Sequence, residues 1–272
     1  MEESRLAELA ARLRIAEADR TPVEPLTSDV PELTVADAYR IQQLNVRARV
    51  NDGDPIRGRK IGLTSEAMQR QLGVDEPDFG ALFASMIVEE GDEVQTAELI
   101  HPRAEAEIGF VMAEELKGPG VTAIDALRAV AGALPTIEVI DSRVTDWKIA
   151  IQDTIADNAS AARVICGARL TPLADVDLRL TGMVLRHNGT VVATGAGAAV
   201  LGNPIRCVAW LANKLGEFGV GLRAGDLVLA GALTAAVAVA AGDTLTADFA
   251  DLGSVTTRFA TEENVHKPLE EE

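Results

Sequence analysis

The pattern of apolar residues in the sequence changes near Gly58, and this change most constrains what the chain can fold into. Before it, residues 4–19 and 34–50 each carry a stripe of apolar side chains at helical spacing, joined by a connector rich in proline and turn-forming residues over 21–33. After it, short apolar runs alternate with Gly and Asp, which is typical of strands linked by tight turns. We therefore predict a helical first fifth followed by β-structure.

Local signals refine this prediction. Thr34 and Asp37 have the spacing of a capping box, which would begin the second helix. Asn188-Gly189 stands between two apolar runs and predicts a two-residue hairpin turn, because both residues accept positive φ. Two further helices are expected, over residues 123–133 and over 203–219, the latter opened by Asn203-Pro204.

The order of the elements indicates the fold class. Strands that follow one another with few crossover helices favour an α+β fold, in which N-terminal helices precede a mixed β-sheet roll. We assign residues 1–56 to an N-terminal helical segment and residues 57–272 to a mixed-β catalytic domain that packs with it as one unit.

Composition excludes several function classes. The net charge is −17 and the aromatic content is 3%, so the chain would repel phosphate backbones and anionic membranes and has few rings to stack on bases. Two cysteines, Cys166 and Cys207, are too few for a disulfide framework or a four-cysteine metal site. The charged N-terminus has no signal-peptide pattern. We expect a cytoplasmic protein that binds neither nucleic acid nor membrane.

Three glutamates stand in apolar runs. Glu105 and Glu107 precede IGFVM, and on a strand they would point to one face with Cα atoms about 6.6 Å apart. Glu138 lies inside a second apolar run. Buried carboxylates are costly unless they are paired or bind a metal, and oxygen ligands without nearby His or Cys favour Mg²⁺ or Mn²⁺. The alternative is a solvated Glu105 and Glu107 with Glu138 paired to an arginine, and spacing alone favours it.

Two other polar features admit two interpretations each. Lys60 enters an apolar strand, where a half-buried lysine near a metal could move protons; a strand-edge lysine that reaches solvent is the commoner case. The polar run Asp153–Ser160 could be a loop that carries chemistry, but its side chains can hydrogen-bond their own backbone, so a turn or helix cap is the better interpretation of this run alone.

Five segments, taken together in order, are more specific than any one of them. They are KIGLTS (60–65), GVDEPDFG (73–80), PRAEAE (102–107), IEVIDSR (137–143) and DTIADNAS (153–160). The series resembles the 2-keto-4-pentenoate hydratase family of the fumarylacetoacetate hydrolase superfamily. The resemblance runs nearly end to end, from LTVADAYRIQ near the start to AWLANKLGEFG and LGSV near the end.

The resemblance implies roles for individual residues. A divalent cation, Mg²⁺ or Mn²⁺, would be held by three carboxylates that match Glu105, Glu107 and Glu138, which reverses the preference from spacing alone. Proton-transfer and substrate-positioning residues match the following three positions: Lys60, Asp78 and Ser160. The substrate pocket would include Leu82, Gly231 and Ala232. The resemblance also implies a homo-oligomer, a pentamer or a decamer.

The implied reaction is hydration of 2-hydroxypenta-2,4-dienoate to 4-hydroxy-2-oxopentanoate in the catabolism of aromatic compounds. Ketonisation would protonate the distal carbon, and water would then add at C4. Two alternatives remain open: decarboxylation of a 4-oxalocrotonate-type dioate, and hydration of a longer 2-hydroxydienoate. A catalytically silent homologue that stabilises a partner enzyme is a further possibility, which the filled site positions argue against.

Overall fold

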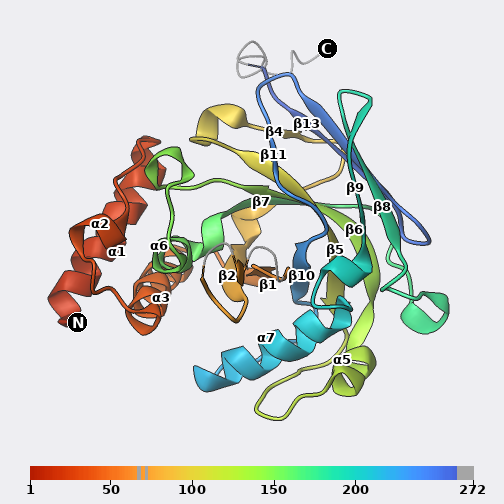
Figure 1. The fold of residues 1–272 in the computed structure, drawn as a ribbon, viewed down its shortest axis with the longest axis horizontal. Helices are drawn as coiled ribbons and strands as arrows, with labels where there is room; N and C mark the ends of the chain where they lie inside the picture. Colours follow the sequence, from red (N-terminus) through yellow and green to blue (C-terminus); the bar gives the residue numbers. More distant parts are fainter. Residues whose placement is uncertain (66–68, 71–72, 262–272) are drawn as a thin grey trace.

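N-terminal helices pack against one side of a curled β-sheet in the computed structural model of the chain (Figure 1). The structure describes residues 1–65, 69–70 and 73–261. The N-terminal helices are α1 (Glu3–Asp19), α2 (Leu26–Asp29) and α3 (Val35–Asn51). Helix α1 packs on α3, and α3 packs on α6 (Ile151–Ala156). The leucine stripe of α1 is buried in these contacts, as its helical spacing predicts.

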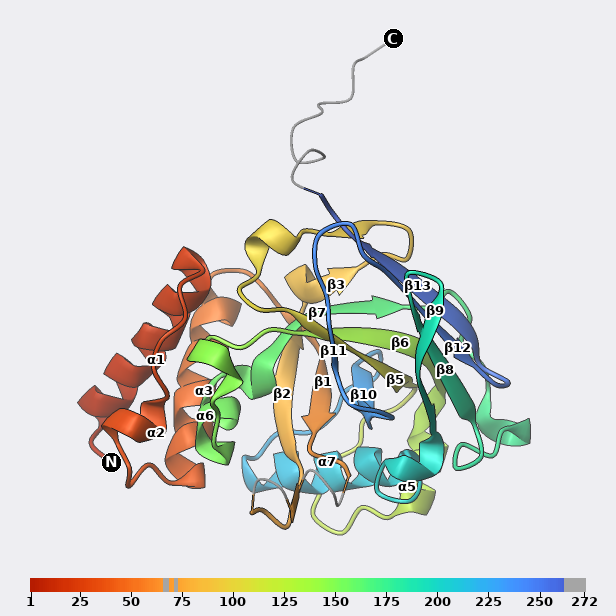
Figure 2. The ribbon, with the colours of Figure 1, turned by 45° about the horizontal axis from the view of Figure 1, so that its top comes forward.

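The larger sheet has eight strands in the described ranges and forms the curled centre of the molecule (Figure 2). Its hydrogen-bonded order is β2 (Asp78–Phe83), β1 (Ile56–Gly62), β10 (Leu227–Ala232), β5 (Arg103–Met112), β6 (Val130–Ile140), β7 (Ala161–Cys166) and β3 (Ile87–Val88), with β11 (Val237–Ala238) also paired to β5. Strands β1 and β10 are parallel, whereas β2–β1, β10–β5 and β5–β6 are antiparallel. The predicted α+β fold with a mixed-sheet roll is confirmed.

A second sheet of five strands packs on β6 and β7 of the first. Its order is β4 (Glu93–Val94), β13 (Gly253–Phe259), β12 (Thr244–Phe249), β8 (Gly182–His187) and β9 (Thr190–Ala196). The hairpin between β8 and β9 turns at Asn188 and Gly189, whose φ angles are 51° and 80°. The predicted two-residue turn is therefore confirmed.

Helix α7 (Ile205–Glu217) packs on β10 and on the short helix α5 (Ala123–Ala129). In Figure 2 the two helices lie together along one end of the larger sheet. Short 3-10 helices complete the described elements: Ala84–Met86, Thr96–Glu98, Thr145–Trp147, Asn158–Ser160, Leu173–Asp175 and Gly197–Ala199. No helix in the described ranges is long and apolar enough to cross a membrane.

Helix boundaries depart from the sequence prediction in two places. The helix expected over 123–133 ends at Ala129, because Val130 begins β6 and residues 130–133 pair in the sheet. The connector over 21–33 contains the short helix α2. In the second helix, Thr34 is the N-cap as predicted, and its Oγ1 accepts a hydrogen bond from the backbone N–H of Asp37 at 3.1 Å.

Candidate metal centre and active site

Three carboxylates converge where β5 and β6 lie side by side. Glu105 and Glu107 alternate with the fully buried Ala104 and Ala106, so the two glutamates share one face of β5. The strand register places Glu138 of β6 directly opposite Glu105. One oxygen from each of the three glutamates can be chosen so that all lie within 4.8 Å of one another.

The electrostatics of this cluster favour a bound cation. Burial raises the pKa of each glutamate, to about 7 for Glu138 and well above the ordinary value for Glu107, whose neighbour Glu138 raises it further. Oε1 of Glu138 is buried and has no hydrogen-bond partner among the described residues. Three oxygen donors with an unsatisfied buried carboxylate fit a hard divalent cation.

Glu107 is oriented by the backbone of β10. Its Oε2 accepts a hydrogen bond from the N–H of Gly231 at 2.8 Å. Gly231 has φ +106°, and a Cβ at this position would lie 2.1 Å from Oγ1 of Thr64. Glycine is therefore required both by the backbone conformation and by the close approach of Thr64.

Lys60 is buried beside the three glutamates, with 4% exposure. Its Nζ lies 3.2 Å from Oε2 of Glu138 and donates a hydrogen bond to the carbonyl of Ala159 at 2.9 Å. Burial lowers the pKa of Lys60, but the charges of Glu138 and Asp78 outweigh burial, so the pKa is raised. The alternative of a strand-edge lysine that reaches solvent is wrong.

Asp78 opens β2 directly opposite Gly62 of β1, on the face that Lys60 shares. Its carboxyl group is buried, and Oδ1 has no hydrogen-bond partner among the described residues. Burial raises the pKa of Asp78, and the charge of Lys60 opposes this shift. A Cβ on Gly62 would lie 2.2 Å from Oδ1, so the glycine makes room for the carboxylate.

Ser160 is the last residue of a turn with an unusual backbone conformation. Asn158, Ala159 and Ser160 all have left-handed φ angles, of 55°, 51° and 57°. The side chain of Asn158 bonds the backbone of Ala81 in β2 twice, accepting from its N–H at 2.7 Å and donating to its carbonyl at 2.9 Å. The buried Oγ of Ser160 has no hydrogen-bond partner in the described part of the chain.

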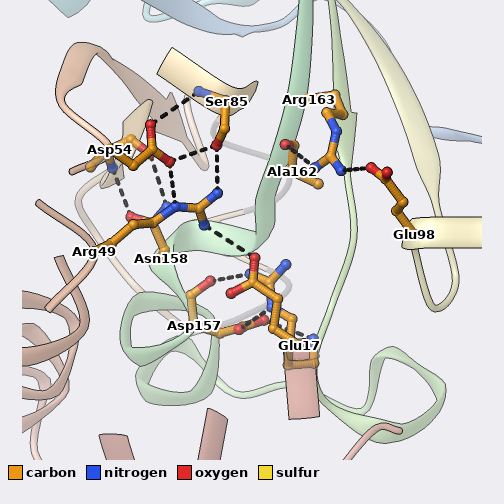
Figure 3. A network of polar contacts seen from close by, with 11 residues as sticks. Glu17, Arg49, Asp54, Ser85, Glu98, Asp157, Asn158, Ala162 and Arg163 are labelled. Carbon is orange, nitrogen blue, oxygen red and sulfur yellow. Dashed lines mark hydrogen bonds and ion pairs between the residues drawn. The ribbon is translucent and has the colours of Figure 1, made fainter. Parts of the chain in front are cut away.

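A buried ion pair supports this turn from behind. Nε of Arg143 lies 2.5 Å from Oδ1 of Asp157, and its Nη2 donates to the Asp157 carbonyl at 2.7 Å. Burial raises the pKa of Asp157 to about 6, although Arg143 opposes the shift. Figure 3 shows the adjoining network, in which Arg49 pairs with Glu17 of α1 and with Asp54. The backbone N–H of Val23, between α1 and α2, donates to the carbonyl of Arg143 at 2.9 Å, which connects the N-terminal segment to the residues beside the turn.

The residues expected in the substrate pocket lie in different surroundings. Leu82 is 1% exposed and belongs to a small apolar cluster with Leu229 and Val164. Gly231 contacts Glu107 as described above, and Ala232 pairs with Glu107 across β10 and β5. Gly231 and Ala232 therefore border the glutamate cluster directly.

The sequence predictions did not identify the residues that hold the Ser160 turn and the neighbouring helix α6 in place. Arg143 lies in one of the family-like segments, but its pairing with Asp157 depends on a contact between β6's end and the segment after α6. The run Asp153–Ser160 is not a simple loop, because Asp153 lies in α6 and its carboxylate accepts from the N–H groups of Thr27 and Ala150. The signal in the sequence that could have indicated these contacts is the high number of Asp, Asn, Ser and Thr residues in this run, because such side chains often hydrogen-bond to the backbone.

Comparison with known proteins places the chain in a family. Residues 33–260 match the family described as Fumarylacetoacetate (FAA) hydrolase C-terminal. The chain is 47% identical over 258 residues to 2-keto-4-pentenoate hydratase of Burkholderia vietnamiensis (strain G4 / LMG 22486), covering 95% of this chain and 98% of that protein. It is 46% identical over 251 residues to 4-oxalocrotonate decarboxylase of Pseudomonas putida, covering 92% of this chain and 95% of that protein.

A solved structure extends the likeness to three dimensions. The structure of 4-oxalocrotonate decarboxylase from Pseudomonas putida G7, complexed with magnesium and adipate, matches with a TM-score of 0.92 and 43% identity, covering 95% of this chain and 98% of that one. The expected resemblance to the 2-keto-4-pentenoate hydratases is thus confirmed. The chain belongs to the fumarylacetoacetate hydrolase family.

Proposed function

We propose that the chain is a metal-dependent hydratase that converts 2-hydroxypenta-2,4-dienoate to 4-hydroxy-2-oxopentanoate. The observation that carries this proposal is the group of three glutamates, two of them fully buried, with Lys60 against one of these two. Two further buried polar atoms, Asp78 Oδ1 and Ser160 Oγ, have no partner among the described residues. Unsatisfied buried polar atoms of this kind are costly in a purely structural role and suit a site that receives a polar ligand. The hydratases among the relatives support the choice of reaction.

Glu105, Glu107 and Glu138 would hold the divalent cation, Mg²⁺ or Mn²⁺. When bound, the cation would supply Lewis-acid stabilisation to the negative charge that develops on the 2-oxo oxygen of the substrate. Its positive charge would also reduce the effect of the glutamates on Lys60, so we expect the pKa of Lys60 to fall towards the range useful for proton transfer.

The reaction needs two proton movements and one water. Ketonisation removes the proton from the 2-hydroxyl and adds one at C5, giving 2-oxo-3-pentenoate. Water then adds its oxygen to C4, and a proton is delivered to C3. We assign the proton shuttle to Lys60, because it is the buried cation adjoining the glutamates. Asp78 and Ser160 would orient the water and the distal carbon through their unpartnered oxygens.

The surroundings of the substrate follow from the same geometry. Gly231 and Ala232 border Glu107, so we propose that their backbone lines the bound substrate. Leu82 would contribute to the apolar wall near its tail. Residues 57–272 would carry the whole site, and residues 1–56 would support it. We also propose a homo-oligomer, a pentamer or a decamer, whose mass light scattering would establish.

The test is the loss of dienol absorbance from freshly prepared 2-hydroxypenta-2,4-dienoate, measured with Mg²⁺ and with a chelator. The proposal expects rapid, metal-dependent loss and formation of 4-hydroxy-2-oxopentanoate. Glu114→Gln, on the exposed loop after β5, is the matched control for substitutions of the three glutamates. A folded, metal-binding protein without turnover would contradict the hydratase assignment.

Decarboxylation is the second candidate, because a 4-oxalocrotonate decarboxylase is among the relatives. Release of carbon dioxide from 2-oxo-3-hexenedioate, without hydration of the five-carbon dienol, would favour it. If the protein hydrated a longer 2-hydroxydienoate in preference to the five-carbon one, the reaction would still be hydration, and the proposed substrate would be the longer acid.

A further inference from the structure

Arg103 lies on the same face of β5 as the glutamate cluster. It begins the strand, and the alternation of side chains places it beside Glu105 with Cα atoms about 6.6 Å apart. Its neighbours across the sheet are Ile140 of β6 and Ala238 of β11. The charge of Arg103 acts on Glu105, where it opposes the burial that raises the pKa of that carboxyl group.

The backbone of Lys60 lies towards the other end of the same face. The register pairs Lys60 with Leu229, and Leu229 with Gly109, which lies beyond Glu107 along β5. The Lys60 ammonium nevertheless reaches Glu138, which is level with Glu105, so Lys60 lies on the interior side of the cluster and Arg103 lies beside Glu105 at the start of β5. Glu105 is partly exposed whereas Glu107 and Glu138 are buried, so the cluster meets solvent at the Arg103 end.

Arg103 is held in place without its charge being neutralised. Its guanidinium carbon lies 4.6 Å from the centroid of the Trp147 ring, and Trp147 Nε1 donates to the carbonyl of His101 at 3.1 Å. Within residues 1–65, 69–70 and 73–261, the Arg103 side chain makes neither an ion pair nor a hydrogen bond. Arg143 and Arg163, by contrast, are paired with Asp157 and Glu98.

A planar guanidinium with free donors is suited to a carboxylate, which it binds through two parallel hydrogen bonds. Such a group matters in a chain of net charge −17, because without it an anionic substrate would be attracted at the site only by Lys60 and the bound cation. If the buried Lys60, Asp78 and Ser160 act on the distal carbons, the carboxylate of the substrate faces the partly exposed side of the cluster. That side is where Arg103 lies, beside Glu105.

We propose that Arg103, stacked on Trp147, binds the carboxylate adjacent to the 2-oxo group of the substrate. This inference rests on the proposed function for the class of substrate, a 2-oxo acid or its dienol. It assigns Arg103 to the carboxylate that mono- and dicarboxylic 2-oxo acids share, and not to a second carboxylate at the distal end. Trp147 acts as a positioning residue, because it touches Arg103 and not the substrate.

The test is equilibrium binding of two unreactive acids, 2-oxopentanoate and 2-oxohexanedioate, to the magnesium-loaded protein by titration calorimetry. Arg103→Gln should weaken both acids by the same factor, about 10- to 100-fold, since a charge-assisted bidentate contact is lost. Arg103→Lys should restore part of the affinity, and Trp147→Leu should give an intermediate loss. Arg128→Gln on α5 removes the same charge away from the site and should change neither affinity.

Two other measurements separate binding from folding and from catalysis. Affinity for Mg²⁺ alone should not weaken in Arg103→Gln, because a cation has been removed from the neighbourhood of the glutamates. With the dienol as substrate, KM should rise while kcat changes little. These binding results stand even if the protein proves not to hydrate the dienol, which would contradict the proposed function alone.

Three results would overturn the inference. The first is unchanged affinity of Arg103→Gln for 2-oxopentanoate, and the second is absence of any binding of this acid to the magnesium-loaded wild type. The third is a loss confined to 2-oxohexanedioate, which would assign Arg103 to the distal carboxylate.

Discussion

Lys60 of β1 and Glu138 of β6 form a buried ion pair across the interior of the curled sheet, with Nζ 3.2 Å from Oε2. The two strands are separated by β10 and β5 in the hydrogen-bonded order. The pair therefore depends on the curvature of the sheet, which brings side chains from non-adjacent strands together. It links a proposed proton-transfer group to a proposed metal ligand, so a cation bound by Glu138 would act directly on Lys60.

Substitution of Lys60 tests the proton shuttle. Lys60→Met should reduce the rate of hydration by about 10²- to 10⁴-fold, the usual contribution of a positioned acid or base. Its affinity for Mg²⁺ should be maintained, because the substitution removes a competing cation from Glu138. Arg59→Met, at the preceding position of β1, is the control for loss of a positive charge from this strand. Near-normal hydration with metal bound would disprove the assigned role of Lys60.

Substitution of Glu107 tests the metal site. Glu107→Gln keeps an oxygen that can accept the hydrogen bond from Gly231 but removes the charge that a cation needs. Calorimetry should show that Mg²⁺ binds more weakly than in the wild type. The loss should exceed the factor of about 10 to 100 that is usual when a residue hydrogen-bonded to a ligand is replaced. Full affinity in this variant would rule out Glu107 as a ligand.

The raised pKa of Glu138 makes stability depend on pH. The pKa is about 7 in the metal-free folded protein, mainly through burial, and about 4.3 in an unfolded chain. A raised folded-state pKa contributes stability below the unfolded value, and this contribution is lost as pH rises through about 7. Added Mg²⁺ should therefore raise the melting temperature more at about pH 8 than at about pH 5.5, where protons compete.

The measurement is thermal unfolding with chelator and with Mg²⁺ at both pH values. Glu138→Gln should remove much of the pH dependence of the chelated protein, because the titrating group is absent. An equal metal-induced shift at the two pH values would contradict the expectation.

Substitutions of the Arg143–Asp157 pair test whether the pair positions the turn that carries Ser160 or only stabilises the fold. Arg143→Met should cost about 3–5 kcal/mol, since it leaves Asp157 buried and unpaired. The double variant Arg143→Met/Asp157→Leu should regain much of this stability, as replaced buried pairs often do. The rate of hydration should be low in the single variant and should stay low in the double variant. Both lack the contacts between Arg143 and Asp157, which hold the start of the turn that carries Ser160. Chemical denaturation and the dienol assay measure the two effects, and recovery of both would show that the pair does not position Ser160.

A pair of glycines isolates the close approach at the metal centre. Gly231 and Gly253 have nearly equal φ angles, +106° and +103°, but only Gly231 has a neighbour in the way of a Cβ, Thr64 Oγ1 at 2.1 Å. Gly253→Ala should show backbone strain alone, about 1–3 kcal/mol. Gly231→Ala should lose more stability and also bind Mg²⁺ more weakly, because the donor to Glu107 shifts. Equal losses in the two variants, measured by denaturation and calorimetry, would contradict this account.

Much of the local structure follows from the sequence. The two long N-terminal helices, the cap at Thr34 and the turn at Asn188-Gly189 depend on neighbours within a few residues, and all three predictions are confirmed. The sharing of one face by Glu105 and Glu107 follows from the two-residue period of a strand. The helix expected through 133 ends early because pairing of residues 130–133 with neighbouring segments outweighs local helix propensity.

The sequence by itself determined which residues could carry the chemistry, but the tertiary structure decided which of them meet. Glu138 faces Glu105 only through the β5–β6 register, and Lys60 reaches Glu138 only because the sheet curls. The left-handed turn at Asn158–Ser160 depends on Arg143 and on the backbone of β2. Periodicity and turn chemistry act over a few residues, whereas register and curvature depend on contacts between segments far apart in the chain.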